Sequence, residues 1–134
     1  MSMGYCASCR MVSEDEQEIL YEYTCYNIGE RNWEELKENF DGVILIKKAA
    51  LAEPIIHKKL KKTPNGKKLV SKRVHVDVSF SALIAAGKIT IENCSGTWQI
   101  TDDGMDVMAL RLVRKIFGEY QDKGAIPENM SYLS

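Results

Sequence analysis

Eight lysines and arginines stand within residues 58–73, and no acidic residue interrupts them. Cationic side chains in such a run attract phosphate by charge and release counterions on binding, which suits a polyanionic partner. We therefore expect an anion-binding segment, and the residues that carry its charge are Lys58, Lys59, Lys61, Lys62, Lys67, Lys68, Lys72 and Arg73. The alternative is a solvated surface whose counter-charge lies elsewhere in the chain. No aromatic residue stands between Phe40 and Phe80, which argues against recognition of single strands by base stacking.

Cys6 and Cys9 have the Cys-x-x-Cys spacing that supplies two thiolates to a tetrahedral zinc ion. The other two cysteines and the two histidines could complete such a site: Cys25, Cys94, His57 and His75. No second Cys-x-x-Cys motif is present, so the spacing gives half of a ligand set. The competing interpretation is two free thiols in a flexible segment, and we expect no bound cofactor.

Residues that could perform catalysis are sparse. His75 and Asp77 share the polar side of an alternating segment, where a general base and its orienting acid could sit together. A single pair of this kind is also typical of an exposed strand face. The sequence contains no nucleophile elbow, glycine-rich phosphate loop or His-Glu metal-binding helix. We therefore expect a protein that is not an enzyme.

Charge is divided along the 134 residues, although the net charge is only −1. Residues 14–41 hold ten acids and two bases, whereas residues 42–73 hold ten bases and one acid. These two blocks, of −8 and +9, can fold against each other or form two separate faces. The hydrophobic share of 45% is that of an ordinary globular domain, and the length fits one domain.

The sequence predicts a cytoplasmic protein without a membrane segment. The first residues lack the apolar region of a secretory signal. The longest aliphatic run, residues 43–46, is far shorter than the roughly 20 residues of a membrane span. Four cysteines are too few for a disulfide scaffold in a chain of this length, which favours reduced thiols.

Periodicity and turn signals predict the elements that must position these residues. Strands are expected at 18–27, 43–46 and 73–80, and a hairpin at 88–101 with its turn near Ser95-Gly96. Helices are expected at 32–40, capped by Asn32, at 52–63, with Pro54 in the first turn, and at 103–124, capped by Asp103. Residues 81–87 form a short helical or turn connection.

The C-terminal helix has the clearest pattern in the chain. Apolar residues recur along one face from Met105 to Tyr120, and Gly124 and Pro127 end the helix. We expect this stripe to lie across a sheet. Its central residues should then share one core with two residues of the preceding hairpin, and the four are Trp98, Ile100, Leu112 and Ile116.

Residues 83–104, LIAAGKITIENCSGTWQITDDG, resemble the end of a winged helix. The resemblance consists of a helix, Gly-x-Ile, a hairpin and then aromatic-x-Ile-Thr-x-x-Gly. It implies a C-terminal winged-helix-like part as an alternative fold. The preceding segment, 74–86, departs from the pattern because it alternates with period two and carries no arginine or lysine.

The sequence as a whole predicts an α+β fold: a mixed, mostly antiparallel sheet of about five strands with three helices, the long C-terminal helix packed on the sheet. We expect a flexible segment at 1–13, one domain at 14–124 and a tail at 125–134. The expected function is that of a small binding or regulatory protein that engages nucleic acid or nucleoprotein through residues 47–73. The alternative is a protein–protein interaction or inhibitor module that uses the acidic surface of 14–41, and a small zinc-binding module is a third hypothesis.

Overall fold

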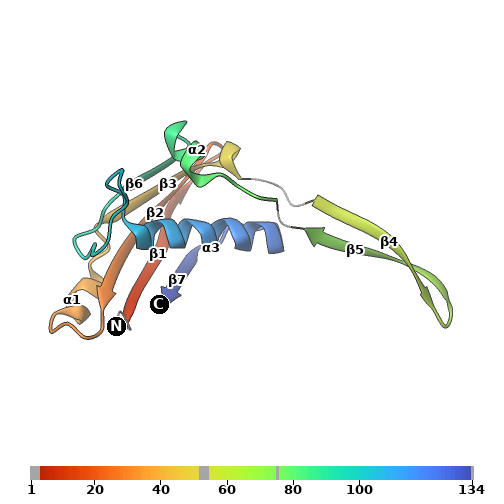
Figure 1. Cartoon of the computed structure of the whole chain (residues 1–134), viewed down its shortest axis with the longest axis horizontal. Helices are drawn as coiled ribbons and strands as arrows, with labels where there is room; N and C mark the ends of the chain where they lie inside the picture. Colours follow the sequence, from red (N-terminus) through yellow and green to blue (C-terminus); the bar gives the residue numbers. More distant parts are fainter. Residues whose placement is uncertain (1–3, 52–54, 75, 134) are drawn as a thin grey trace.

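The computed structural model describes residues 4–51, 55–74 and 76–133. Its main sheet has five strands in the order β6-β3-β2-β1-β7, and every registered pair in it is antiparallel (Figure 1). The strands are β1 (Tyr5–Glu14), β2 (Glu18–Asn27), β3 (Gly42–Lys47), β6 (Ile89–Glu92) and β7 (Asn129–Leu133). The helices are α1 (Trp33–Glu38), α2 (Phe80–Ala85) and α3 (Val107–Lys123), with a 3-10 turn η1 at Lys48–Ala50. The α+β class and the long C-terminal helix on an antiparallel sheet are thus confirmed.

Strand β2 forms the centre of the sheet, and its two faces differ as period-two alternation dictates. Its odd-numbered side chains are fully buried beneath α3: Ile19, Tyr21, Tyr23 and Cys25. Its other face carries Glu18 and Glu22 and then meets α1, where Thr24 donates a 2.5 Å hydrogen bond to the Leu36 carbonyl. The strand predicted at 18–27 is therefore confirmed at both ends.

Helix α3 lies across the sheet and buries the predicted apolar stripe (Figure 1). Leu112 and Ile116 are fully buried, as expected. Trp98 and Ile100 are not part of this core, because residues 97–99 form no strand and these side chains are 39% and 57% exposed. The N-cap is Asp106 rather than Asp103, and the chain leaves the helix at Gly124 in a left-handed conformation with φ 69°.

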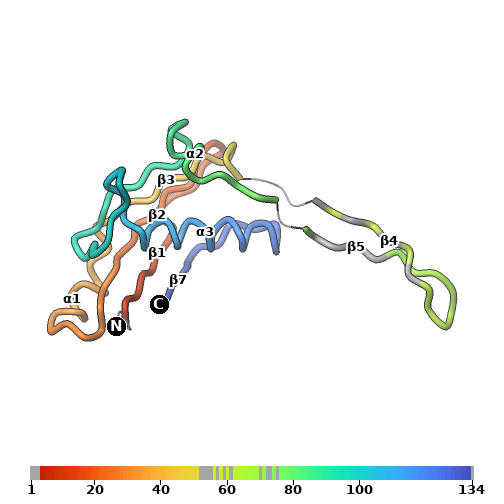
Figure 2. The backbone as a smooth tube through the Cα atoms, in the orientation of Figure 1, coloured from red at the N-terminus to blue at the C-terminus, as the bar shows by residue number. Residues whose placement is uncertain are grey.

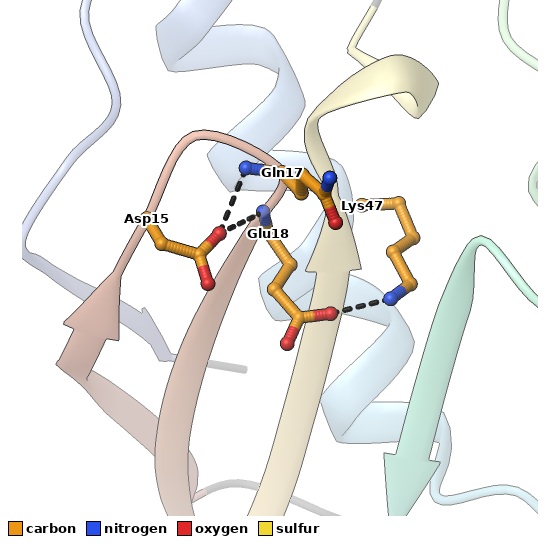
Figure 3. Close-up of polar contacts among 4 residues, drawn as sticks. All are labelled: Asp15, Gln17, Glu18 and Lys47. Atoms are coloured by element: carbon orange, nitrogen blue, oxygen red, sulfur yellow. Dashed lines mark hydrogen bonds and ion pairs between the residues drawn. The ribbon is translucent and has the colours of Figure 1, made fainter.

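The two ends of the chain form strands that pair with each other. Residues 5–13, expected to be flexible, belong to β1, which lies between β2 and β7. Part of the expected tail, Asn129–Leu133, is β7. A tight turn joins β1 to β2, in which the Asp15 carboxylate accepts hydrogen bonds from the backbone N–H groups of Gln17 and Glu18 (Figure 3). The mixture of small and polar residues in β1 conceals its strand character, because two neighbouring strands rather than its own side chains stabilise it.

The helix predicted at 52–63 is wrong. Residues 55–74 form a separate antiparallel hairpin of β4 (Ile55–Thr63) and β5 (Gly66–Val74). Ile56 and Leu60 are four residues apart, a spacing that fits a helical face and also one face of a strand. The turn at Thr63–Gly66 decides between them, because it places each residue of β4 opposite one of β5. Pro54, expected to start the helix, lies outside the described residues.

Two further strand predictions are also wrong. The strand expected at 73–80 ends at Val74, and residues 76–79 have no regular structure. Gln121 of α3 takes the place of a neighbouring strand there, because its side-chain amide accepts from the Val76 N–H at 2.8 Å and donates to the Val76 carbonyl at 3.2 Å. The hairpin at 88–101 contributes only β6, so the helix-and-hairpin arrangement of a winged helix is not formed.

Truncation of the stripe should unfold the protein more readily. Leu112→Ala removes a fully buried side chain between α3 and the sheet, so we expect the free energy of unfolding to fall by about 2–5 kcal/mol. Denaturant melts followed by circular dichroism measure this loss. The control is Lys123→Ala, which removes an exposed ion pair with Glu119 on the same helix and should cost only a small fraction of that loss. Equal effects of the two substitutions would show that the stripe is not the core.

Candidate nucleic-acid interface and a buried cysteine–aspartate cluster

The hairpin of residues 55–74, here called the basic arm, extends away from the main sheet (Figure 1; Figure 2). It contains eight of the chain's 18 lysines and arginines and no acidic residue. Because two extended strands of nine residues each carry this charge, the cations are spread along a narrow ribbon rather than around a helix.

Half of the predicted anion-binding side chains are described, and all four are exposed: Lys58, Lys62, Lys67 and Lys68. The other four have a described backbone in the two strands, but their side chains lie outside the described part: Lys59, Lys61, Lys72 and Arg73. The register places Lys62 opposite Lys67, and both side chains are exposed, so like charges face each other near the tip.

One apolar cross-strand pair interrupts the lysines of the basic arm. Leu60 is opposite Leu69, and these side chains are 64% and 56% exposed. Because directly opposed residues share a face of an antiparallel pair, the two leucines lie on the same face as Lys62 and Lys67. This face of the basic arm therefore offers an apolar centre beside cationic ends.

Three acids of residues 14–41 form ion pairs with cations outside the basic arm. Glu18 of β2 pairs with Lys47 of β3 in direct register (Figure 3), and Glu22 pairs with Arg10 of β1 in the same way. Glu14 pairs with Lys48 at 2.7 Å. Three acids of residues 14–41 are thus neutralised by cations of the main sheet and η1. The first two lysines of the predicted segment 47–73 belong to this network rather than to the basic arm.

The Cys-x-x-Cys motif does not bring its two thiols together. Cys6 and Cys9 are three residues apart on β1, so their side chains point to opposite faces of the sheet. Cys6 is opposite Tyr26 and Cys9 is opposite Tyr23 in the β1–β2 register. Burial raises the pKa of the Cys9 thiol to about 12, which makes it an inert core residue.

Cys25 and Cys94 meet instead in a buried cluster with Asp106. The two sulfur atoms are 3.2 Å apart, and the Asp106 Oδ2 atom lies 3.0 Å from Cys25 Sγ and 3.8 Å from Cys94 Sγ. All three side chains are buried. They come from β2, from the turn that follows β6 and from the N-cap of α3, so the cluster joins three parts of the fold.

Two hydroxyl groups complete this Cys25–Cys94–Asp106 cluster. Tyr23 donates to Asp106 Oδ2 at 2.8 Å and accepts from the Cys94 N–H at 3.1 Å. The Thr97 hydroxyl lies 2.7 Å from the Cys94 carbonyl and 3.1 Å from Asp106 Oδ2. The second carboxylate oxygen, Oδ1, accepts from the Met108 N–H at 2.9 Å and so caps α3.

The thiol of Cys25 has one proton to donate and two possible acceptors within reach, Cys94 Sγ and Asp106 Oδ2. The hydrogen bond to Cys94 is the largest influence that raises the pKa of Cys25, with burial second. The same hydrogen bond lowers the pKa of Cys94 to about 7. Burial and the neighbouring Asp106 carboxylate both raise the pKa of Tyr23, so its hydroxyl remains a donor at neutral pH.

Two glycines allow the chain to come close enough to β2 for the cluster to form. A Cβ atom on Gly96 would lie 2.0 Å from the Cys25 carbonyl oxygen, and one on Gly42 would lie 2.2 Å from the Tyr23 ring. The turn of residues 93–97 is fixed further by Asp41, which accepts from the Ser95 N–H at 3.0 Å, and by Asn93, which accepts from the Asp106 N–H at 2.9 Å. Because any side chain at position 96 would collide with the Cys25 carbonyl, only glycine allows the turn to place Cys94 in contact with β2.

Sequence patterns could not reveal this cluster. Its members are separated by 69 and 81 residues from Cys25, and no short motif links them. The local sequence feature that indicates the cluster is a cysteine and a glycine close together between β6 and α3, Cys94 and Gly96. The predicted hairpin includes both residues as parts of an ordinary turn. Of the His75–Asp77 pair weighed in the sequence, Asp77 is exposed in an irregular segment, and His75 lies outside the described residues.

The chain matches no protein-family model, no curated protein and no solved structure. None of the helices within the described residues is long and apolar enough to cross a membrane.

A methyl group at position 96 should disrupt the cluster. Gly96→Ala places a Cβ against the Cys25 carbonyl, so the turn must move and we expect a loss of about 1–3 kcal/mol in the free energy of unfolding. Thermal and denaturant melts test this. Gly118→Ala in α3 is the matched control, because its Cβ would meet nothing within 4 Å and alanine favours a helix over glycine by roughly 0.5–1 kcal/mol. Gly96→Ala with unchanged stability would contradict the close approach.

Proposed function

We propose that the protein binds duplex nucleic acid, or a nucleoprotein that exposes it, through the basic arm and without strong preference for base sequence. The observation that carries the proposal is the combination of shape and charge in the basic arm: a hairpin that extends away from the main sheet and holds eight cations without an acid. Lysines that serve only to keep a domain soluble are expected to be distributed over its surface. In this protein they are concentrated on one separate hairpin.

The shape of the basic arm supports a duplex partner. A two-stranded antiparallel ribbon fits the major groove of B-form DNA, and proteins of several kinds insert such ribbons there. Lysines contact the phosphate oxygens and position the protein without reading sequence. The exposed Leu60–Leu69 pair adds an apolar surface of the kind that contacts thymine methyl groups in the groove.

The distribution of acids supports the same proposal. Glu14, Glu18 and Glu22 are already paired with cations beside the main sheet. The described lysines of the basic arm are exposed, so their field is directed at solvent and at a partner. The alternative proposal, a protein–protein or inhibitor module that uses residues 14–41, has less free charge available because of these three ion pairs.

Binding to DNA should be salt-sensitive and should depend on the tip of the basic arm. Contacts with four to six phosphates give log K against log[salt] a slope of about −3.6 to −5.4. Lys62→Glu combined with Lys67→Glu reverses two opposed charges, so we expect much weaker binding and a shallower slope. Titration of a labelled 20-base-pair duplex of arbitrary sequence by fluorescence anisotropy, at several salt concentrations, measures both quantities.

The matched control is Lys88→Glu combined with Lys123→Glu, which changes the net charge equally at exposed positions outside the basic arm. This control should retain most of the affinity. Absence of binding at low salt would refute the proposal. An equal loss in the control and in the arm variant would also refute it, because attraction would then follow net charge alone.

A further inference from the structure

The buried cluster of Cys25, Cys94 and Asp106 has a composition that a hydrophobic core does not require. We propose that these three side chains bind one thiophilic divalent metal ion of the zinc class, with two thiolates and one carboxylate as its ligands. This site is independent of the basic arm and of the proposed binding to nucleic acid. It is also distinct from the Cys6–Cys9 spacing, which β1 directs to two faces.

The distances between the three ligand atoms fit such an ion. Two sulfur atoms each about 2.3 Å from zinc lie about 3.8 Å apart at the tetrahedral angle, and sulfur and carboxylate oxygen lie about 3.5 Å apart. The observed separations are 3.2 Å between the sulfurs and 3.0 and 3.8 Å from sulfur to Asp106 Oδ2. A movement of about half an ångström at Cys25 would therefore complete the geometry.

Charge and proton balance also favour a cation. Starting from two thiols, binding releases two protons to solvent, one from each sulfur, and leaves a complex of two thiolates, one carboxylate and one M²⁺ with net charge −1. Groups already in place offset this charge. Tyr23 donates to Oδ2, Met108 N–H donates to Oδ1, and the N-terminal end of the 17-residue α3 favours a negative group.

One residue of the cluster's surroundings also lines the protein surface. Thr97 lies 3.6 Å from Cys94 Sγ through its hydroxyl oxygen and is only partly buried. The same residue lines a surface pocket of about 240 Å³, whose other walls include Gly96, Trp98 and Leu36. Thr97 thus lies between this pocket and the cluster, and its hydroxyl, 3.1 Å from Asp106 Oδ2, is the fourth ligand that the proposal assigns to a tetrahedral ion.

A disulfide is the other chemistry that two close sulfurs suggest. It would use only Cys25 and Cys94 and would leave Asp106 with its structural hydrogen bonds alone, from Tyr23, Thr97 and the Met108 N–H. It would also need an external oxidant to accept two electrons and two protons. A metal ion uses all three side chains and the two hydroxyl groups around them, which is why the cluster favours it.

Titration of the reduced full-length protein with Co²⁺ as a spectroscopic probe tests the site. We expect one equivalent to bind, with a thiolate-to-cobalt charge-transfer band and the visible bands of a tetrahedral ion, and Zn²⁺ should displace it. Cys94→Ser should abolish the charge-transfer band or weaken cobalt binding at least tenfold. Cys6→Ser and Cys9→Ser are matched controls, because they alter the other two buried cysteines and should retain both the band and the affinity.

X-ray absorption of the zinc-loaded wild-type protein provides a measurement that does not depend on the folding of any variant. It should find two sulfur neighbours at about 2.3 Å and oxygen neighbours at about 2.0 Å. No charge-transfer band, a band and a cobalt affinity that are both unchanged by Cys94→Ser, or three or four sulfur neighbours would each overturn the proposal. So would a purified protein that binds no cobalt after complete reduction and is 2 Da lighter than its reduced mass before that treatment, since the pair would then be a disulfide.

Discussion

The buried carboxylate of Asp106 connects β2, the turn after β6 and the start of α3 through its hydrogen bonds. It is fully buried, and a buried charge is tolerated only where donors surround it. Those donors come from three elements: Tyr23 from β2, the Met108 N–H from α3 and Thr97 from the turn after β6. One side chain therefore fixes where α3 begins, which tyrosine faces it and how the preceding turn approaches the sheet. The apolar stripe supplies most of the burial, but Asp106 sets its register on the sheet.

The two faces of β2 explain how a chain with opposite charge blocks remains ordered. The odd-numbered residues form the core under α3, while Glu18 and Glu22 are each directly opposite a cation of a neighbouring strand. Cross-strand pairs of opposite charge stabilise a sheet, and the partners of these two acids are cations of the same sheet rather than those of the basic arm. The charge division therefore has two outcomes. Part of the acidic block is neutralised within the sheet, and the described lysine side chains of the basic arm are left exposed.

Elements with a single strong pattern could be predicted from sequence, and those that depend on distant partners could not. The alternation of residues 18–27 and the long stripe of α3 identify β2 and the C-terminal helix correctly. Ile56 and Leu60 fit two periods equally well, so the choice between helix and strand at β4 depended on pairing with β5. Strand β1 has no pattern of its own and is stabilised by β2 and β7. The cluster of Cys25, Cys94 and Asp106 brings together residues from the second strand and from the last third of the chain, which only the fold can do.

The opposed lysines near the tip of the basic arm make the stability of the hairpin depend on ionic strength. Lys62 is directly opposite Lys67, and like charges in direct cross-strand register repel and weaken the hairpin. Added salt screens this repulsion and so strengthens the hairpin, although the same screening weakens attraction to a polyanion. Under the proposed function, the stability of the hairpin and its affinity for a polyanion would therefore change in opposite directions with ionic strength. A bound phosphate backbone would act as counter-charge to the lysines, so the proposed ligand would also stabilise the hairpin that binds it.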